Sequence, residues 1–519
     1  MTSLLRSKTV GAKAAGDHIV HESESEAHQI FRQYPSHGDR TQKHKHSVPA
    51  ISHPGSTGVI YVMDRAQSNG FYYGCPGWSN LGQGAPEVGH IDGAAPKPKN
   101  IDLESFGEGV HEYAPTTGTK EFRQAVADYY NQTYRANQPK KYGPQNVCVV
   151  PGGRAGLSRV AAVISEVMCG YQLPEYTAYE NCLGVFRNLI PIPTQLKASD
   201  HYKLSIDGLR DEIRHRGLSA VVMSNPRNPT GQQACIRHHA PETCICKQRP
   251  KLTRHTIRSH QIEGEELKKL VETAVEMDVT FVLDEFYSWY QLEGELGRAV
   301  SAAEYIEDPN EAPVVLIDGL TKNWRCPGWR VCWVVGPEDL ITALNECGSF
   351  LDGGASHPMQ CAALPMLDYE RTVQDRIALQ KHFRAKRDHC LKRLSEMGLT
   401  VKVPPVATFY IWLDLSTLPA PLSSGLVFHE ELLREKCIVT PGIFFDVNPQ
   451  HRRNIVDSPC EKFVRISCGP PLEELDRGMD AIERVLKKSR DHGARSAMGR
   501  NYRRSSMTAT NLHAPQGHA

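Results

Sequence analysis

The sequence contains no uninterrupted apolar run of about 20 residues, the length that a helix needs to cross a lipid bilayer. It also shows no secretory signal pattern near its first residues. Asp17 is the first acidic residue, and it follows Arg6, Lys8 and Lys13. An N-terminal stretch that is basic and free of acids is typical of transit peptides. We therefore predict a cytoplasmic protein, with a mitochondrial location as the alternative.

The chain also lacks an excess of charge of either sign, because 60 Lys and Arg face 59 Asp and Glu. Nothing in this balance favours binding to nucleic acid or to a membrane surface. The 15 cysteines are an odd number without the spacing of a disulfide framework, which indicates a reduced, intracellular protein. At 519 residues the chain is long enough for two or three domains.

Three stretches lack the apolar periodicity of a packed element. Residues 1–55 and the basic tail 488–519 are predicted to be disordered. The third stretch, 232–261, interrupts the middle of the chain, and a loop of this length inside a compact domain is unusual. It is predicted to be either a disordered surface insertion or sequence that is absent from the mature protein. Cys235, Cys244 and Cys246 suggest zinc, but their spacing matches no standard ligand set, so we expect no metal.

The rest of the chain alternates between short β-branched runs and amphipathic stretches. This order predicts an α/β fold with a doubly wound, mainly parallel sheet in a large domain, 111–360. The expected strands are 146–150, 219–223, 280–283, 314–317 and 331–335, and the expected helices include 157–168 and 265–277. A smaller α+β domain is predicted from 361–487, joined by an N-terminal segment, 56–110. It would contain a long helix through 377–394, strands at 408–413 and 463–467, and a last helix at 472–486.

Four candidate site residues directly follow predicted strands: Gly153, Asn228, Asp284 and Lys322. Ligands of doubly wound sheets bind beyond the carboxyl ends of the strands, so we expect these residues to meet in one site. Lys322 lies between two apolar runs, where burial would lower its pKa and leave a nucleophilic amine. A lysine on a surface loop is the ordinary alternative for this position taken alone.

These motifs together resemble the class I/II aminotransferases, the fold type I enzymes of the aspartate aminotransferase superfamily that use pyridoxal 5′-phosphate. The resemblance extends from about 80 to 486, interrupted by the 232–261 stretch. It implies that Lys322 forms the Schiff base with the cofactor and that Arg330, eight positions later, holds the cofactor phosphate. The chain departs from the family pattern at Arg325, Cys326 and Cys332, where small or aliphatic residues are usual.

The resemblance also assigns residues around the cofactor ring. Asp284 would pair with the ring nitrogen and keep it protonated, and Tyr287 and Asn228 would contact the ring hydroxyl. Tyr176 would stack on the ring, with Tyr179 as the alternative, because the preceding stretch 168–173 has little strand character.

Other matches concern the phosphate, the substrate and a second subunit. Gly153, Arg154 and Ala155 open a predicted helix and resemble the family's phosphate cup. Arg465 would grip the substrate α-carboxylate, the segment containing Gly84 would close over the substrate, and Asn228 would also bind the substrate. Tyr113 resembles the tyrosine that reaches the phosphate of the neighbouring subunit, which implies a homodimer with shared active sites.

The implied activity is a ping-pong transfer of an amino group between an L-amino acid and a 2-oxo acid, with Lys322, Asp284 and Tyr287 as catalytic residues. A lyase of the same fold, such as an aminocyclopropane-carboxylate synthase or a carbon–sulfur lyase, is the first alternative. A cofactor-binding regulator is the second, although residues 1–55 show no helix-turn-helix pattern. Asp352 stands where dicarboxylate-specific relatives have arginine. This speaks against aspartate as the preferred substrate and leaves polar or basic side chains open.

Overall fold

The structure is a computed structural model, and it describes residues 58–185, 189–232, 264–449, 453 and 458–510. The predicted N-terminal disorder, most of the 232–261 stretch and its zinc alternative lie outside these residues. Within the described residues, no cluster of His, Cys, Asp or Glu could hold a metal ion. Nor does this part of the chain contain a helix with the length and apolar character that crossing a membrane requires.

The largest element is a seven-stranded sheet with the order β2-β8-β7-β6-β5-β3-β4. All neighbouring strands are parallel except β8, which is antiparallel to both β2 and β7. The central strands are buried and rich in Val, Leu and Ile, as expected for strands covered on both faces. Their bounds are β2 Val147–Val150, β3 Met168–Leu173, β4 Ile190–Gln195, β5 Leu218–Ser224, β6 Thr280–Asp284, β7 Val314–Gly319 and β8 Cys332–Val335.

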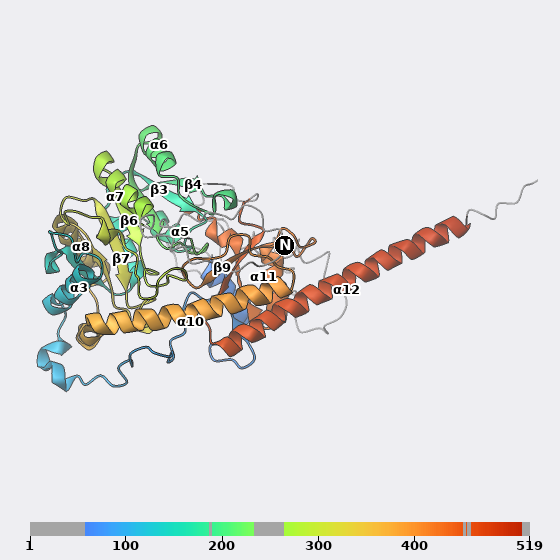
Figure 1. Cartoon of the computed structure of the whole chain (residues 1–519), viewed down its shortest axis with the longest axis horizontal. Coiled ribbons are helices and arrows are strands. Elements are labelled where there is room, and N and C mark those ends of the chain that lie inside the picture. Colours follow the sequence, from blue (N-terminus) through green and yellow to red (C-terminus); the bar gives the residue numbers. More distant parts are fainter. Residues whose placement is uncertain (1–57, 186–188, 233–263, 450–452, 454–457, 511–519) are drawn as a thin grey trace, which may run out of the picture.

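Helices from the same part of the chain pack on this sheet (Figure 1). Helix α4 contacts β2, β7 and β8. Helix α6 contacts β5, α7 contacts β6, and these two helices also contact each other. The predicted α/β class with a mainly parallel, doubly wound sheet is therefore confirmed. The bounds are α3 Lys120–Thr133, α4 Gly153–Val163, α5 Tyr179–Val185, α6 Ile206–Arg216, α7 Glu265–Met277, α8 Glu338–Leu351 and α9 His357–Ala363.

A second, smaller layer contains the antiparallel sheet β11-β12-β9, formed by Thr440–Pro441, Phe463–Ser467 and Tyr410–Asp414. The N-terminal segment joins it, because β1 (Ser79–Asn80) pairs with β10 (Cys437–Ile438). Long helix α10 (Tyr369–Glu396) runs from the large sheet towards this layer and contacts α12 (Leu472–Thr510) (Figure 1). The remaining helices are α2 (Val59–Ser68) and α11 (Gly425–Arg434).

One predicted helix is shorter than expected. Helix α4 ends at Val163, and Met168, expected on its apolar face, instead begins strand β3. The sequence shows little strand character here because β3 is paired on both sides, with β4 and β5, and is buried almost throughout. A strand of this kind needs no alternation of polar and apolar residues, so tertiary pairing decides its structure.

The C-terminal prediction of disorder from 488 is wrong as far as residue 510, because α12 continues to Thr510. Figure 1 shows this helix extending away from the body of the molecule. Residues 488–510 contain no proline, and their five Arg, three Ala and two Met residues have high helix propensity. Residues 511–519 lie outside the described part of the chain.

Candidate active site

A cavity of about 380 Å³ lies at the carboxyl ends of the parallel strands. Its position follows the rule for doubly wound sheets, where loops after adjacent strands meet at one edge. Ten of the twelve predicted site residues line it: Gly84, Gly153, Arg154, Tyr176, Asn228, Asp284, Tyr287, Lys322, Arg330 and Arg465. The strand-end residues are therefore brought together as expected.

Lys322 follows β7 and points its amine into this cavity. Burial and the nearby charge of Arg465 lower the pKa of the amine to about 7, and the Asp284 carboxylate only partly offsets this shift. The amine donates a hydrogen bond to the main-chain oxygen of Gly84. Near neutral pH a large fraction of Lys322 is therefore unprotonated and able to act as nucleophile or base.

Asp284, the last residue of β6, forms part of the cavity wall as a buried carboxylate. Burial raises its pKa to about 6, even though the Phe286 N–H and the Tyr179 hydroxyl, at 3.4 and 3.3 Å, stabilise the ionised form. Tyr179 thus contacts the carboxylate without lining the cavity, whereas Tyr176 lines the cavity itself. This geometry separates the two tyrosines between which the sequence left a choice.

Arg465 and Asn228 meet at another wall of the cavity. Arg465 Nη1 donates to Asn228 Oδ1 at 3.0 Å, and its Nη2 donates to the Gly82 carbonyl at 2.8 Å. The guanidinium lies over the ring of Tyr410, 4.2 Å from the centroid. Its Nε is buried and has no hydrogen-bond partner among the described residues. A buried arginine without a carboxylate partner is well suited to receive an anion.

Tyr410 is a cavity residue that the sequence did not reveal. Its hydroxyl lies 2.9 Å from that of Tyr287. Burial raises the pKa of both hydroxyls, so both keep their protons at neutral pH. Tyr410 begins β9, more than 100 residues after Tyr287, and only the pairing of β9 with β12, next to Arg465, could have indicated its place.

The far end of the cavity is formed by the turn after β2 and by Arg330. Gly152 has a φ of +107°, and a Cβ there would lie 1.7 Å from Nη2 of Arg330. At Gly153, a Cβ would lie 2.4 Å from the Phe286 ring. Helix α4 begins at Gly153, so its free N–H groups face a space flanked by the side chains of Arg154 and Arg330. This end has the donors and the positive charge that a phosphate requires.

Two predicted residues do not line the cavity. Ala155 lies in the first turn of α4, where its side chain is only partly buried. Tyr113 is 97% exposed and makes no wall of the cavity within the described chain.

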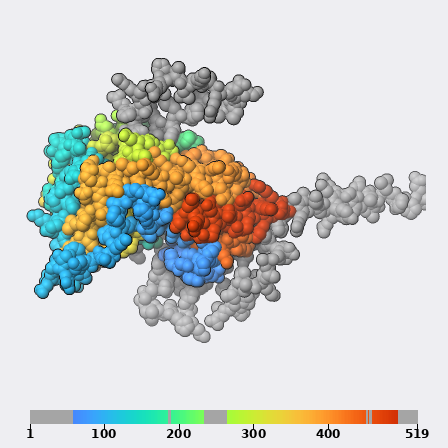
Figure 2. Space-filling view, turned by 60° about the horizontal axis from the view of Figure 1, so that its bottom comes forward, coloured from blue at the N-terminus to red at the C-terminus, as the bar shows by residue number. Residues whose placement is uncertain are grey.

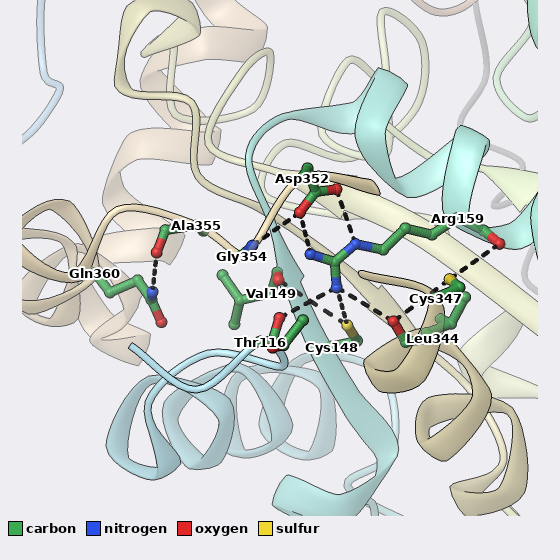
Figure 3. A network of polar contacts seen from close by, with 10 residues as sticks. All are labelled: Thr116, Cys148, Val149, Arg159, Leu344, Cys347, Asp352, Gly354, Ala355 and Gln360. Carbon is green, nitrogen blue, oxygen red and sulfur yellow. Dashed lines mark hydrogen bonds and ion pairs between the residues drawn. The ribbon is translucent and has the colours of Figure 1, made fainter. Parts of the chain in front are cut away.

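Asp352, which the sequence placed at the substrate-specificity position, does not line the cavity and instead pairs with Arg159. Figure 3 shows the buried Arg159 side chain pointing at its carboxylate. Arg159 Nε donates to Asp352 Oδ2 at 3.0 Å and Nη2 pairs with Oδ1, while Nη1 donates to the Thr116 carbonyl at 3.1 Å. The ion pair holds the pKa of Asp352 below its usual range.

Comparison with known proteins places the chain in a family. The family model for aminotransferase class I and II matches residues 76–238 and 262–482. The chain belongs to the aminotransferase class I and II family. The expected enzyme class, a transaminase, is thereby confirmed.

Individual relatives are distant. A probable aspartate/prephenate aminotransferase of Aquifex aeolicus is 23% identical over 75% of this chain and 87% of its own length. Aromatic-amino-acid aminotransferase 2 of Thermococcus litoralis is 24% identical over 80% and 94%. The structure of an aspartate aminotransferase of Thermus thermophilus with maleate matches with a TM-score of 0.64 and 21% identity, covering 83% of this chain and 97% of that one. None of these relatives is named as a lyase, and the structural likeness confirms the fold.

Proposed function

We propose that this aminotransferase uses pyridoxal 5′-phosphate to move an amino group between an L-amino acid and a 2-oxo acid by a ping-pong mechanism. The observation that carries the proposal is a single cavity that holds the amine of Lys322, the buried carboxylate of Asp284 and the partly unpaired guanidinium of Arg465. Near neutral pH the Lys322 amine is partly unprotonated and the Asp284 carboxylate is ionised, as the reaction requires.

The residues of the cavity fit the cofactor. The glycines of the 152–153 turn leave no room for a Cβ, and the α4 N-terminus, Arg154 and Arg330 offer donors for its phosphate. Asp284 would face the ring nitrogen, Tyr176 the ring face, and Asn228 and Tyr287 the ring hydroxyl. When bound, pyridoxal phosphate supplies an electron-withdrawing ring that stabilises the charge left on a substrate carbon after a proton is removed.

The chain's own residues would move the proton and orient the substrate. Lys322, unprotonated in part at neutral pH, would take the proton from the α-carbon and later return it. Arg465 would bind the α-carboxylate through its free Nε and an Nη, and Asn228 would hold its plane. Tyr287 and Tyr410 would keep their protons and act as hydrogen-bond donors.

We also infer that the substrate side chain is uncharged. The cations of the cavity are Arg154 and Arg330 at the phosphate end, Lys322, and Arg465 at the carboxylate end, so the described chain leaves no cation for a second carboxylate. A basic side chain finds no free acid either, because Asp352 pairs with Arg159. Of the polar and basic side chains that the sequence left open, the cavity therefore favours the uncharged polar ones.

We also propose that the chain forms a homodimer and that it is divided into a large and a small domain. The full exposure of Tyr113 supports a homodimer in which this side chain reaches the neighbouring subunit's cavity. The pairing of β1 with β10 supports assignment of 56–110 to the small domain with 361–487, beside the large domain 111–360.

The test is the visible absorption spectrum of the purified protein with pyridoxal phosphate, recorded before and after a panel of amino acids is added. We expect a visible band that is absent in Lys322→Ala and that a neutral amino acid converts to the aminated cofactor's spectrum, with release of a 2-oxo acid. Release of pyruvate or a cyclised product without amino transfer would instead identify the lyase alternative. A colourless protein would contradict the proposal.

A further inference from the structure

Arg325, in the turn that follows Lys322, is a buried arginine with no place in the proposed chemistry. It is 5% exposed, and its φ of +56° lies in the left-handed region. Its N–H donates to the Lys322 carbonyl at 3.0 Å. Its Nη1 donates to the main-chain oxygens of Glu87 at 2.9 Å and Gly89 at 2.6 Å. The side chain therefore fastens the stretch 84–89, here called the cover segment, to the turn that carries Lys322.

The cover segment contacts the groups that matter most in the cavity. The Gly84 carbonyl accepts the hydrogen bond of the Lys322 amine, and the Gly82 carbonyl just before it accepts that of Arg465. Ala85 lines the cavity itself. A Cβ at Gly469 would lie 2.2 Å from the Ala85 carbonyl oxygen, so the chain passes here with no space to spare.

A second set of contacts fastens the cover segment from the side of α10. The Glu87 carboxylate accepts hydrogen bonds from His382 Nε2 at 2.8 Å and from Lys386 Nζ at 2.9 Å. The Lys97 ammonium closes the arrangement by donating to the Arg325 carbonyl at 2.6 Å. Figure 2 shows a blue stretch from the N-terminal part of the chain lying against the orange part, whose colour includes α10. The ion pair between Glu87 and Lys386 is partly buried, where solvent weakens it less than at the surface. Burial lowers the pKa of His382, so its contact with Glu87 is a hydrogen bond from the neutral ring at neutral pH.

We infer that Arg325 and Glu87 are positioning residues that hold the cover segment in place over the amino-acid substrate. The Arg325 Nη1 group on two carbonyls, together with the contacts of Glu87 to His382 and Lys386, removes freedom that the substrate would otherwise have to remove on binding. They also keep the Gly82 and Gly84 carbonyls where they direct Arg465 and Lys322. This inference rests on the proposed function, and it gives a reason for arginine at a position where the family has smaller residues.

The test compares the parent enzyme with Arg325→Ala, Glu87→Gln and a control, Arg135→Ala. Arg135 is also fully buried and donates to main-chain oxygens, those of Ala303 and Ile306, but it lies outside the cavity. We expect R325A to raise the KM for the amino acid at least about 10-fold, while the Kd for pyridoxal phosphate changes by less than about twofold. Methylguanidine, which can occupy the vacated space, lowers the KM of R325A again and leaves that of R135A unchanged.

A second readout needs neither cofactor nor turnover. Acetylation of Lys322 by acetic anhydride is followed by mass spectrometry in the cofactor-free proteins. Release of the cover segment in R325A uncovers the amine and speeds its acetylation about fivefold or more, and R135A leaves the rate unchanged.

The inference is overturned if R325A leaves both KM and acetylation within twofold of the parent, or if R135A changes them as much. If R325A does not fold, E87Q is the deciding variant, and we expect its KM for the amino acid and its rate of Lys322 acetylation each to rise about threefold. Unchanged values of both in E87Q would overturn the inference. A parent enzyme that transfers no amino group disproves the proposed function alone, since the acetylation rates still test the cover segment.

Discussion

The hydroxyl of Tyr179, a residue outside the cavity lining, donates to Oδ2 of Asp284 at 3.3 Å. Tyr179 is fully buried, and burial raises the pKa of its hydroxyl well above the ordinary value, so it remains a donor. Its hydrogen bond is one of the contacts that limit the pKa of Asp284 to about 6 despite complete burial. A residue that does not line the cavity thus sets the charge of one that does.

The first prediction is that Tyr179→Phe weakens cofactor binding at mildly acidic pH. Asp284 is ionised above about pH 6 and becomes protonated below it, so the affinity for pyridoxal phosphate falls as the pH drops through 6. Loss of the hydroxyl removes a contact to the ionised form, raises the pKa further and moves this fall upward by about one pH unit. Absorbance titrations with the cofactor between pH 5 and 8 measure the shift.

The matched control is Tyr171→Phe. Tyr171 is equally buried but donates to the Val447 carbonyl at 2.9 Å, away from the cavity. Its variant should show the parent's pH dependence, and an equal shift in both variants would rule out the specific role of Tyr179.

The second prediction concerns Arg465. In the parent, the planar guanidinium donates to Asn228 and Gly82 and has a free Nε. Arg465→Lys keeps the positive charge but loses this planar set of donors. We expect KM for the amino acid to rise about 100-fold and the Kd for pyridoxal phosphate to stay within about twofold. Steady-state kinetics with the free amino acid and its amide measure the effect.

The amide supplies the internal control, because it lacks the carboxylate that Arg465 is proposed to bind. Parent and variant should use the amide equally poorly. A variant that loses as much activity on the amide as on the acid would show that Arg465 supports the cavity rather than the carboxylate.

Much of this cavity could be predicted because its residues occupy fixed places after strands. Asn228 and Lys322 follow strands, and Asp284 ends one, that the sequence marks by apolar, β-branched residues. Parallel topology brings those strand ends together. The mainly parallel character of the sheet follows from the same alternation of strands and helices.

What the sequence could not predict depends on contacts between distant segments. Tyr410 reaches the cavity through β9 pairing in another sheet, and Arg325 is explained only by carbonyls more than 200 positions earlier. Tyr179 and Tyr176 are alike in sequence, and only the turn between β3 and α5 directs one to the Asp284 carboxylate and the other into the cavity. Tertiary packing also decides β3.

The third prediction tests the phosphate end through Gly152→Ala. The added Cβ would overlap the Arg330 guanidinium, so Arg330 must move from its place beside the α4 N-terminus. We expect the affinity for pyridoxal phosphate to fall at least about 10-fold, since a bidentate phosphate contact is lost. Titration of the cofactor-free protein with pyridoxal phosphate, compared with pyridoxal lacking the phosphate, measures the change.

Gly217→Ala provides the control for backbone strain. Gly217 also has a positive φ, +64°, but a Cβ there meets open space at the end of α6. It should cost about 1 kcal/mol of folding free energy without a change in cofactor affinity. If G217A weakens cofactor binding as much as G152A, strain rather than the Arg330 clash explains the loss.

The last prediction separates stability from substrate choice at Asp352. Asp352→Asn removes the charge that neutralises the buried Arg159, whose guanidinium would then face only neutral acceptors such as the Thr116 carbonyl (Figure 3). Breaking a buried pair on one side costs about 3 kcal/mol, which urea unfolding of the cofactor-free protein can measure. Because the pair lies outside the cavity, the ratio of kcat/KM between neutral and basic amino acids should not change. The opposite result would be a D352N variant of unchanged stability with a weaker preference for basic amino acids. That result would mean that Asp352 contacts the substrate directly, as its position in the sequence suggested.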